Sequence, residues 1–227
     1  LENPQKFSKN IKKFLKKDGT LIIEIEYLQN FLKNLEYERF YFDRPYYYSA
    51  NSIKQLFKKV GMQLYDIEKV NIHGGSLRCY IKNSQNNKES QRCKKILSDE
   101  IKNLNLKAFN TFNKEIFRNS KILKEKLINL KKKGFNIIGY GCPARVSTIT
   151  NVSNIDSALI KYIIDDSPLK QNRFTPGMHI KILPRKGNLN NKINIVIVFA
   201  YEYFKDIKKF FRNKKVNFYK PIPFSKL

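Results

Sequence analysis

The spacing of apolar residues at the start of the chain predicts a helix followed by a strand. Residues 5–17 are rich in lysine, and their apolar positions fall on one helical face: Phe7, Ile11, Phe14 and Leu15. A turn at 18–19 precedes the run 20–25 (TLIIEI), which predicts a largely buried strand. Such a strand is typical of a parallel sheet, yet nothing before it provides a parallel neighbour. Since the chain also lacks an initiator Met, we expect it to be a fragment of a longer protein.

Two further helices are predicted from their spacing and from the residues at their ends. Residues 52–60 form one, with Ser49 or Asn51 as its N-cap and Gly61 at its end. A long helix is expected to begin at Ser98 and to end in a basic stretch before Gly134, because cations favour a helix C-terminus. Its apolar positions recur at helical spacing: Ile101, Leu104, Phe109, Phe112, Ile116, Leu123, Leu127 and Leu130.

The remaining apolar runs predict strands. Two lie at 64–70 and 77–81 and are joined by the turn 71–76, and the polar stretch 82–92 predicts a surface loop. In the last part of the chain the expected strands are 135–138, 159–164, 193–199 and 216–219. Helices are expected after the first of these strands and at 202–212. This alternation predicts an α/β fold with a mostly parallel sheet.

Composition narrows the class of protein. With 227 residues, 41% of them hydrophobic, the chain can bury a sizeable core, which excludes disorder over its whole length. No apolar run approaches the roughly 20 residues of a membrane span, and no secretory signal opens the chain. The cysteines at 79, 93 and 142 have no metal-ligand spacing and cannot all pair. We therefore expect a cytoplasmic protein that holds no metal in this chain.

The chain is strongly basic: it has 45 Lys and Arg residues and only 19 Asp and Glu residues, which gives a net charge of +26. Such an excess is typical of surfaces that bind nucleic acid or an anionic membrane. However, the lysines are spread along the chain, and the other abundant residue types, Asn, Ile, Phe and Tyr, share A/T-rich codons with Lys. We therefore favour a compositional bias over nucleic-acid binding, and expect a basic cleft to suit a substrate that carries phosphate.

Residues 139–145 (GYGCPAR) follow a predicted strand and open a predicted helix. Glycines at such a turn let backbone N–H groups approach a phosphate at the helix N-terminus, and Arg145 is a candidate partner for that phosphate. The same glycines also suit a tight turn without a ligand. The residues alone leave both interpretations open.

Residues 165–177 (DDSPLKQNRFTPG) follow the next predicted strand. Ligands of open α/β sheets bind at the carboxyl ends of the strands, so acidic and basic residues at this place indicate a polar ligand. A long ordered loop is the alternative interpretation, and it stays equally open.

Two segments in the first half of the chain carry further candidates. Residues 73–78 (HGGSLR) join two predicted strands, as a hairpin turn with a capping histidine or as a functional loop whose glycines leave N–H groups open; we favour the second. Residues 41–48 (YFDRPYYY) could hold an acid and phenols near a substrate, or form an aromatic core segment with one surface ion pair. Composition favours the core segment.

In this order, the segments resemble one family, the sugar-nucleotide C-methyltransferases. The resemblance rests on the strand 20–25, the Tyr/Ser-rich stretch 41–49 and the segments 73–78, 139–145 and 165–177, and it covers nearly the whole chain. Members of this family use S-adenosylmethionine to methylate carbon 3 of 4-keto deoxysugars carried on a nucleoside diphosphate. They contain an N-terminal zinc-binding module, a Rossmann-like methyltransferase domain and a C-terminal Rossmann-like domain.

The resemblance implies a domain division, a cofactor and a partner. Residues 1–96 would be the C-terminal portion of the methyltransferase domain with the catalytic segment, 97–133 a connecting helix, and 134–227 the C-terminal Rossmann-like domain. The S-adenosylmethionine pocket would lie mostly in a missing N-terminal part, and the zinc of the family would not be held by this chain. The expected partner is a nucleoside-diphosphate sugar, rather than a membrane or nucleic acid.

The chemistry of the family requires a base beside the sugar. The 4-keto group acidifies the proton on carbon 3, a base removes that proton, and the enolate attacks the methyl sulfonium. The usual Tyr-His-Glu-His motif aligns with Tyr41, Phe42, Asp43 and Arg44, so both histidines are lost and Arg44 cannot act as a base. Either Asp43 or Tyr41 is then the base, or the chain performs a different methyl transfer, or it is inactive. Arg44 would instead polarise a carbonyl or pair with a diphosphate.

The resemblance thus implies a set of site residues. The candidate catalytic residues are Tyr41, Asp43, Arg44 and His73. The candidate substrate-binding residues are Ser76, Arg78, Gly139, Gly141, Ala144, Arg145, Asp165, Lys170 and Arg173. Arg145 and Lys170 are expected to hold the diphosphate. Cys142 is interpreted as a small buried residue, and Glu202, where the family has Asn, adds a negative charge near the expected phosphate.

Two rival hypotheses remain at this point. The same fold could bind a nucleotide sugar without catalysing a reaction, which the lost histidines favour. A basic nucleic-acid-binding protein is the second rival, and its affinity would fall steeply with salt.

Overall fold

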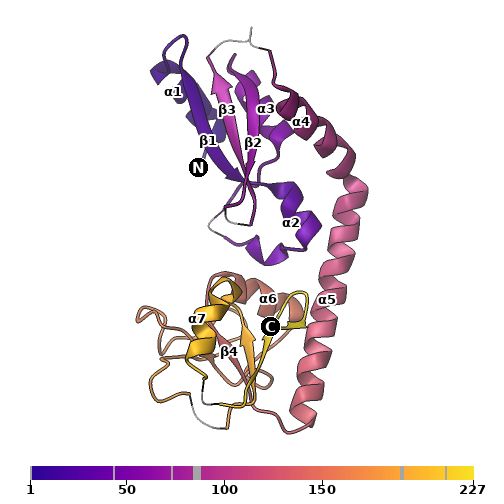
Figure 1. The fold of residues 1–227 in the computed structure, drawn as a ribbon, viewed down its shortest axis with the longest axis vertical. Helices are drawn as coiled ribbons and strands as arrows, with labels where there is room; N and C mark the ends of the chain where they lie inside the picture. The colour runs from indigo at the N-terminus through magenta and orange to yellow at the C-terminus, as the bar shows by residue number, and fades with distance from the viewer. Residues whose placement is uncertain (1, 43, 73, 84–87, 190–191, 213) are drawn as a thin grey trace. The chain divides into compact units, whose positions relative to one another are not determined.

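The computed structural model describes residues 2–42, 44–72, 74–83, 88–189, 192–212 and 214–227. The chain forms two compact units (Figure 1). The first comprises Leu1–Asn34 and Phe42–Phe112, and the second comprises Leu35–Tyr41 and Asn113–Leu227. The segment 35–41 therefore belongs to the second unit although the residues on both sides of it belong to the first.

The first unit contains a three-stranded sheet in the order β1-β3-β2 (Figure 1). Its strands are β1 (Thr20–Glu26), β2 (Gln63–Val70) and β3 (Ser76–Lys82). β3 is antiparallel to both neighbours, so β1 and β2 run in the same direction. The strand predicted at 20–25 is present, but the expectation of parallel neighbours for it was wrong among the described residues. It pairs with β3, which follows it by more than fifty residues in the sequence.

The helices that cover one face of this sheet do so because each presents an apolar stripe to the core. They are α1 (Pro4–Phe14), α3 (Ala50–Lys58) and α4 (Gln91–Asn103). The short helix α2 (Leu28–Asn34) follows directly after β1. The shared core includes Ile53, Phe57, Leu77 and Leu97. Of the two N-caps considered for α3, the structure uses Ser49, whose hydroxyl accepts from the backbone N–H of Ser52.

The single long helix expected from Ser98 is in fact two helices, α4 and α5 (Leu106–Lys132). α4 begins after Ser90, whose hydroxyl accepts from the backbone N–H of Cys93. Ser98 therefore lies inside α4, and the prediction that it caps the helix was wrong. The backbone leaves the helical conformation at Leu104, and Asn105 accepts from the N–H of Ala108 to start α5. The predicted end holds, since Gly134 has a φ of 78°.

The second unit contains a six-stranded sheet in the order β6-β5-β4-β7-β8-β9. Its strands are β4 (Ile137–Tyr140), β5 (Ile163–Ile164), β6 (Ile182–Leu183), β7 (Ile195–Val198), β8 (Asn217–Lys220) and β9 (Ser225–Lys226). All neighbours are parallel except β8 and β9. Every residue of β4 and β7 is buried, as expected for strands covered on both faces. The predicted α/β class with a mostly parallel sheet is confirmed.

Short helical segments follow two of these strands: α6 (Arg145–Ser153) comes after β4, and the 3-10 turn η2 (Tyr201–Tyr203) and α7 (Phe204–Lys209) come after β7. A further 3-10 turn, η1 (Tyr37–Arg39), belongs to the segment 35–41. Hydrogen bonds tie segment 35–41 to the rest of this unit: the hydroxyls of Tyr37 and Ser120 lie 3.2 Å apart, Thr148 donates to the Phe40 carbonyl, and Tyr201 donates to Glu38. η1 therefore packs against α6 within the second unit.

Some predicted boundaries shift in this unit. The first strand includes Gly139 and Tyr140, which were expected in the turn after it. The strand expected at 159–164 is limited to its last two residues, since the chain still forms a turn over 157–159. The helix expected at 202–212 is shortened to α7 and is preceded by η2. None of the helices among the described residues has both the length and the apolar character that crossing a membrane requires.

Candidate functional site

The carboxyl ends of β4 and β7 mark the place where the strand order of the second sheet reverses. From β4 the chain continues to β5 and β6 on one side, and then returns to β7 and β8 on the other. Ligands of open α/β sheets bind outside the strands at such a reversal. The loops that leave β4 and β7 therefore frame the candidate site.

The glycine-rich turn after β4 is closely packed. A Cβ at Gly139 would lie 2.8 Å from Ile163, and a Cβ at Gly141 would lie 2.4 Å from the Cβ of Ala200. Gly141 also has a φ of 78°, which side-chain-bearing residues rarely adopt. Glycine is thus required here by packing and backbone conformation, whether or not a phosphate binds.

The N–H groups of this turn are engaged within the fold. Gly141 donates to the Ile164 carbonyl at 2.7 Å, and Cys142 donates to Oδ2 of Asp165 at 2.6 Å. These two donors already have protein acceptors, so they are not free for a phosphate. Ala144 directly precedes the first residue of α6 and has no side-chain capping group.

Asp165 connects the ends of β4 and β5. Besides the Cys142 N–H, its buried carboxylate accepts from the N–H of Ser167 at 2.9 Å and lies 3.5 Å from Nζ of Lys170. Gln171 donates to the Asp165 carbonyl, which adds order to the loop 165–177. Lys170 thus faces an acidic residue of its own loop, and Arg173 is exposed further along.

Cys142 is buried next to Asp165. Burial, helped by the carboxylate of Asp165, raises the pKa of the Cys142 thiol to about 11. The thiol is therefore protonated at neutral pH. This agrees with the interpretation of Cys142 as a small packed residue rather than a nucleophile.

Arg145, the first residue of α6, lies at the centre of a charged cluster. Its Nη1 lies 2.7 Å from Oε1 of Glu202, and its guanidinium carbon lies 4.8 Å from the centroid of the Tyr201 ring. Nζ of Lys220 lies 4.5 Å from the same centroid. Burial opposes the charge of Arg145, yet Tyr201 and Glu202 outweigh this effect, and the pKa of Arg145 is raised.

A buried carboxylate supports this cluster from η1. Glu38 is 3% exposed, and its Oε1 accepts from the Tyr201 hydroxyl at 2.8 Å. Among the described residues, its Oε2 has no hydrogen-bond partner. Burial, and then the charge of Glu38, raise the pKa of Tyr201. The phenol therefore stays protonated and keeps donating to Glu38.

A second polar group lies at the ends of β4, β5 and β6. The Tyr140 hydroxyl donates to Asp166 at 2.9 Å, and Nε of Arg185 lies 3.1 Å from the same carboxylate. The Arg185 guanidinium covers the Phe210 ring, with its carbon 3.6 Å from the ring centroid. Gln171, Pro184, Lys186 and Leu189 complete a surface pocket around this group.

The other predicted residues from the first half of the chain include Arg44 and Ser76, which make structural contacts within the first unit. Arg44 forms a close ion pair with Glu26 at the end of β1. Ser76 is buried, and its hydroxyl donates to the Ile72 carbonyl at 3.0 Å. Tyr41 is half-buried and belongs to the second unit. Asp43 and His73 lie outside the described residues.

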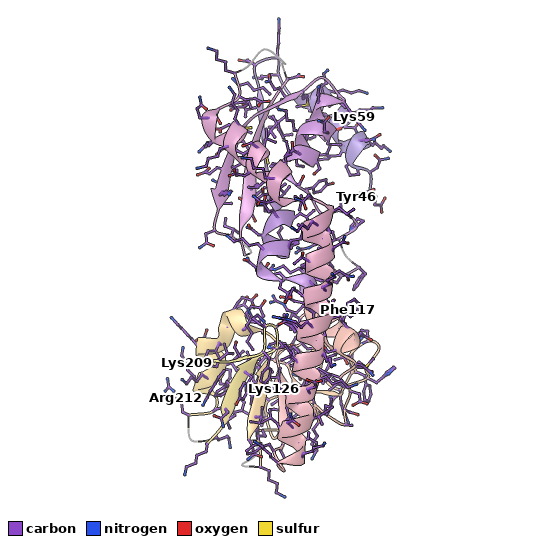
Figure 2. All side chains as sticks on the ribbon, turned by 90° about the vertical axis from the view of Figure 1, so that its right-hand side faces the viewer. Tyr46, Lys59, Phe117, Lys126, Lys209 and Arg212 are labelled. Carbon is purple, nitrogen blue, oxygen red and sulfur yellow. The ribbon has the colours of Figure 1, made fainter. Side chains whose placement is uncertain are left out.

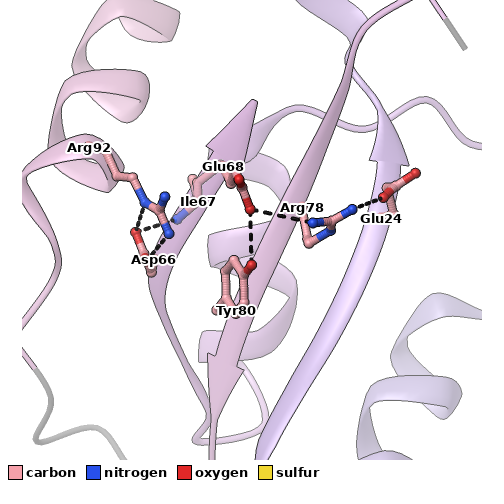
Figure 3. A network of polar contacts seen from close by, with 7 residues as sticks. All are labelled: Glu24, Asp66, Ile67, Glu68, Arg78, Tyr80 and Arg92. Carbon is pink, nitrogen blue, oxygen red and sulfur yellow. Dashed lines mark hydrogen bonds and ion pairs between the residues drawn. The ribbon is translucent and has the colours of Figure 1, made fainter. Parts of the chain in front are cut away.

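Arg78 lies in a row of charges across the three-stranded sheet (Figure 3). It faces Glu24 of β1 and Glu68 of β2 directly, with N···O separations of 3.2 and 3.5 Å. The Tyr80 hydroxyl also donates to Glu68. These side chains are one third or more exposed, so Arg78 serves as a cross-strand partner on a surface face.

The structure therefore brings together only part of the predicted set. Gly139, Gly141, Arg145 and Asp165 meet at the edge of the second sheet, whereas Ser76 and Arg78 lie in the first unit. Three residues of the cluster escaped the sequence analysis as site residues: Glu38, Tyr201 and Lys220. The sequence offered a reason to consider Tyr201, since it adjoins Glu202 directly after a strongly apolar strand. Nothing in the sequence marked Glu38 or Lys220 as site residues.

Comparisons with known proteins support the resemblance. A family model described as C-methyltransferase C-terminal domain matches residues 71–223, more than half of the chain. The C-methyltransferase NovU of Streptomyces niveus is 23% identical over 212 residues, which cover 91% of this chain and 50% of NovU. The chain thus spans about half the length of this curated relative.

Proposed function

Because this chain belongs to the C-methyltransferase C-terminal domain family, we propose that it is the C-terminal part of an S-adenosylmethionine-dependent enzyme that methylates a nucleoside-diphosphate keto-deoxysugar. The observation that carries this proposal is the charged cluster around Arg145 at the reversal point of the second sheet. Ligands of such sheets bind at the carboxyl ends of the strands, and a diphosphate is bound there by cationic side chains. NovU is itself described as a C-methyltransferase.

In this proposal the domain division follows the resemblance: 1–96 is the end of a methyltransferase domain, and 134–227 is the substrate-holding domain. The connecting segment 97–133 consists of the end of α4 and the whole of α5. The parallel direction of β1 and β2 is compatible with strands from the end of a larger sheet. The substrate-binding role is assigned first to Arg145, and with it to Lys170 and Arg173 in the next loop.

The cofactor would supply the methyl group. The glycine-rich turn of this chain does not provide a cradle for it, because Ile163, Phe199 and Ala200 fill the space beside its glycines. No described residues form a group of three metal-binding side chains for the zinc of the family.

The candidates for the base lie in the first half of the chain. Arg44 keeps its charge near neutral pH and pairs with Glu26, so it cannot remove the carbon 3 proton. Tyr41, Asp43 and His73 stay proposed. In this assignment Arg44 orients the segment, and Tyr41 or Asp43 accepts the proton.

Binding of a nucleotide sugar tests the substrate class. We expect this chain to bind dTDP-glucose in isothermal titration, and to bind thymidine or glucose far more weakly because they lack the diphosphate. Arg145→Ala should weaken dTDP-glucose binding by at least about tenfold, the equivalent of about 1.4 kcal/mol. Arg118→Ala is the matched control, since Arg118 pairs with Glu115 on the exposed side of α5. Equal affinities for dTDP-glucose and thymidine would contradict the proposal.

A non-catalytic binding module is the second candidate, and the replacement of a family histidine by Arg44 favours it. The product of the complete reading frame, incubated with labelled S-adenosylmethionine and a dTDP-4-keto-6-deoxysugar, distinguishes the two. Label transferred to the sugar supports the enzyme. Tight sugar-nucleotide binding without transfer supports the module.

A further inference from the structure

Three neighbouring parallel strands end at the cluster around Tyr201. Arg145 follows β4, Tyr201 follows β7, and Lys220 is the last residue of β8. Because β4, β7 and β8 are adjacent and parallel, these three side chains lie at one edge of the sheet. Two cations from separate strand ends thus approach the same aromatic ring, at 4.8 and 4.5 Å from its centroid.

Two carboxylates neutralise this cluster in different ways. Glu38 is buried and hydrogen-bonded to Tyr201, so it is a fixed part of the fold. Glu202 is the ion-pair partner of Arg145, and its side chain is 40% exposed. An anion arriving from solvent can therefore displace Glu202 from Arg145 but has no comparable access to Glu38.

Lys220 differs from the other lysine considered for phosphate binding. Lys170 lies 3.5 Å from Asp165 after β5, on the other side of β4. Among the described residues, no carboxylate forms an ion pair with Lys220, which contacts the Tyr201 ring instead. The positive charge of Lys220 is therefore less neutralised by a neighbouring carboxylate than that of Lys170, and it can attract an incoming anion more strongly.

We propose that Arg145 and Lys220 form a binding site for the diphosphate of the substrate, and that Glu202 is a built-in competitor that occupies Arg145 until the diphosphate displaces it. This inference rests on the proposed function for the identity of the ligand. It replaces Lys170 by Lys220 as the partner of Arg145. It also makes Glu202 a determinant of affinity, because the ligand must first break the ion pair of Arg145.

The test uses this chain and inorganic pyrophosphate as the probe, in isothermal titration at constant ionic strength. Glu202→Gln keeps the size of the side chain but removes the competing charge, so pyrophosphate should bind about three- to tenfold more tightly. Lys220→Met keeps an apolar stem over Tyr201 but removes the cation, so binding should weaken by about tenfold or more. Circular dichroism of each variant checks that it folds.

Two matched controls separate this site from the general positive charge of the chain. Glu125→Gln removes a carboxylate that lies 4.0 Å from Lys121 on α5. Lys208→Met removes a lysine that likewise lies over an aromatic ring, 5.8 Å from the centroid of Phe204. Neither control should change pyrophosphate binding. Equal effects of Lys208→Met and Lys220→Met would show non-specific anion binding and overturn the site.

The remaining outcomes distinguish this inference from the proposed function. Unchanged or weaker pyrophosphate binding by Glu202→Gln overturns the competitor role. Tight dTDP-glucose binding that is insensitive to Glu202 and Lys220 overturns the inference but leaves the proposed function standing. Site-specific pyrophosphate binding with no added affinity for dTDP-glucose supports the anion site but contradicts a nucleotide-sugar substrate.

Discussion

Asp165 and Glu38 are both buried carboxylates, and their hydrogen bonds show what each does in the fold. Asp165 accepts from two backbone N–H groups, which belong to the turn after β4 and to its own loop. Glu38 accepts from one phenol, that of Tyr201. A buried carboxylate is costly unless donors surround it. Asp165 therefore organises the loops of the candidate site, and Glu38 depends on the cluster around Arg145 for compensation.

The partly exposed carboxylate of Asp66 should make the stability of the fold depend on pH. It accepts from Arg92 and Ser90 and from the N–H of Ile67, and the hydrogen bond from Arg92 is the main reason why its pKa lies below the ordinary value of 3.8. A depressed pKa in the folded state means that the carboxylate stabilises the fold above about pH 4, and that this contribution is lost as the pH falls through the folded pKa.

Asp66→Asn should therefore lower the urea midpoint at about pH 7, by the equivalent of about 1 kcal/mol or less for such a surface pair. The difference from the unchanged chain should shrink when the titration is repeated below about pH 4. Asp18→Asn, in the exposed turn before β1, is the control and should leave the midpoint unchanged at every pH. A difference that stays constant down to the acid limit would show that the charge of Asp66 has no part in it.

At the scale of the elements, Glu100 of α4 links two helices of the first unit. It is 1% exposed, and its oxygens accept from the N–H groups of Ala50 and Asn51 at 2.6 and 2.7 Å. These N–H groups are at the start of α3, where the helix dipole favours an anion. The carboxylate thus closes the N-terminus of α3 from a helix fifty residues away in the sequence.

Glu100→Gln should destabilise the first unit by about 1–3 kcal/mol, because an amide donor replaces one acceptor in front of buried N–H groups. Urea unfolding followed by circular dichroism measures the loss, and hydrogen exchange should show faster exchange at the start of α3. Glu125→Gln on the exposed side of α5 is the control. Unaltered exchange at α3 would mean that other groups satisfy these donors.

At the scale of the whole molecule, the positive charge is distributed over both units. Basic side chains such as Lys59, Lys126, Lys209 and Arg212 extend from separate elements (Figure 2). Several are paired locally, as Lys209 is with Asp206. This distribution fits a compositional bias better than a dedicated nucleic-acid surface.

We therefore expect weak, sequence-independent binding of duplex DNA at low salt that disappears at about 200 mM salt. Fluorescence anisotropy with two unrelated duplexes over a salt series measures this. Equal affinities and a steep loss support non-specific attraction by the net charge of +26. Preference for one duplex that persists at high salt would instead establish the nucleic-acid-binding hypothesis.

The elements were largely predictable because their signals are local. The strands at 20–25, 64–70 and 77–81 and the helix after Ser49 were found from apolar period and capping residues alone. The interruption at Leu104 was missed, because the apolar positions continue at helical spacing across it. The short strands β6 and β9 were missed as well, since two residues carry no period.

The candidate site was predictable only in part. Arg145 was found because it follows a strand and a glycine pair, both of which are visible in the sequence. Glu38 could not be predicted as a site residue, since the hydrogen bond that links it to the site comes from the phenol of Tyr201, 163 residues away in the sequence. In the sequence nothing distinguishes Lys220 from the many other lysines. Only the order of the strands places it beside Tyr201.

The residue pattern was thus sufficient for the α/β class, for most of the helices and strands, and for the family resemblance. These depend on period, turn chemistry and short motifs, which act over a few residues. Strand pairing decided that β1 is antiparallel to its neighbour, and packing decided that the glycines of the turn face Ile163 and Ala200. The charges around Arg145 were likewise brought together by strand order, because electrostatic attraction depends on distance in space, and sequence separation does not fix that distance.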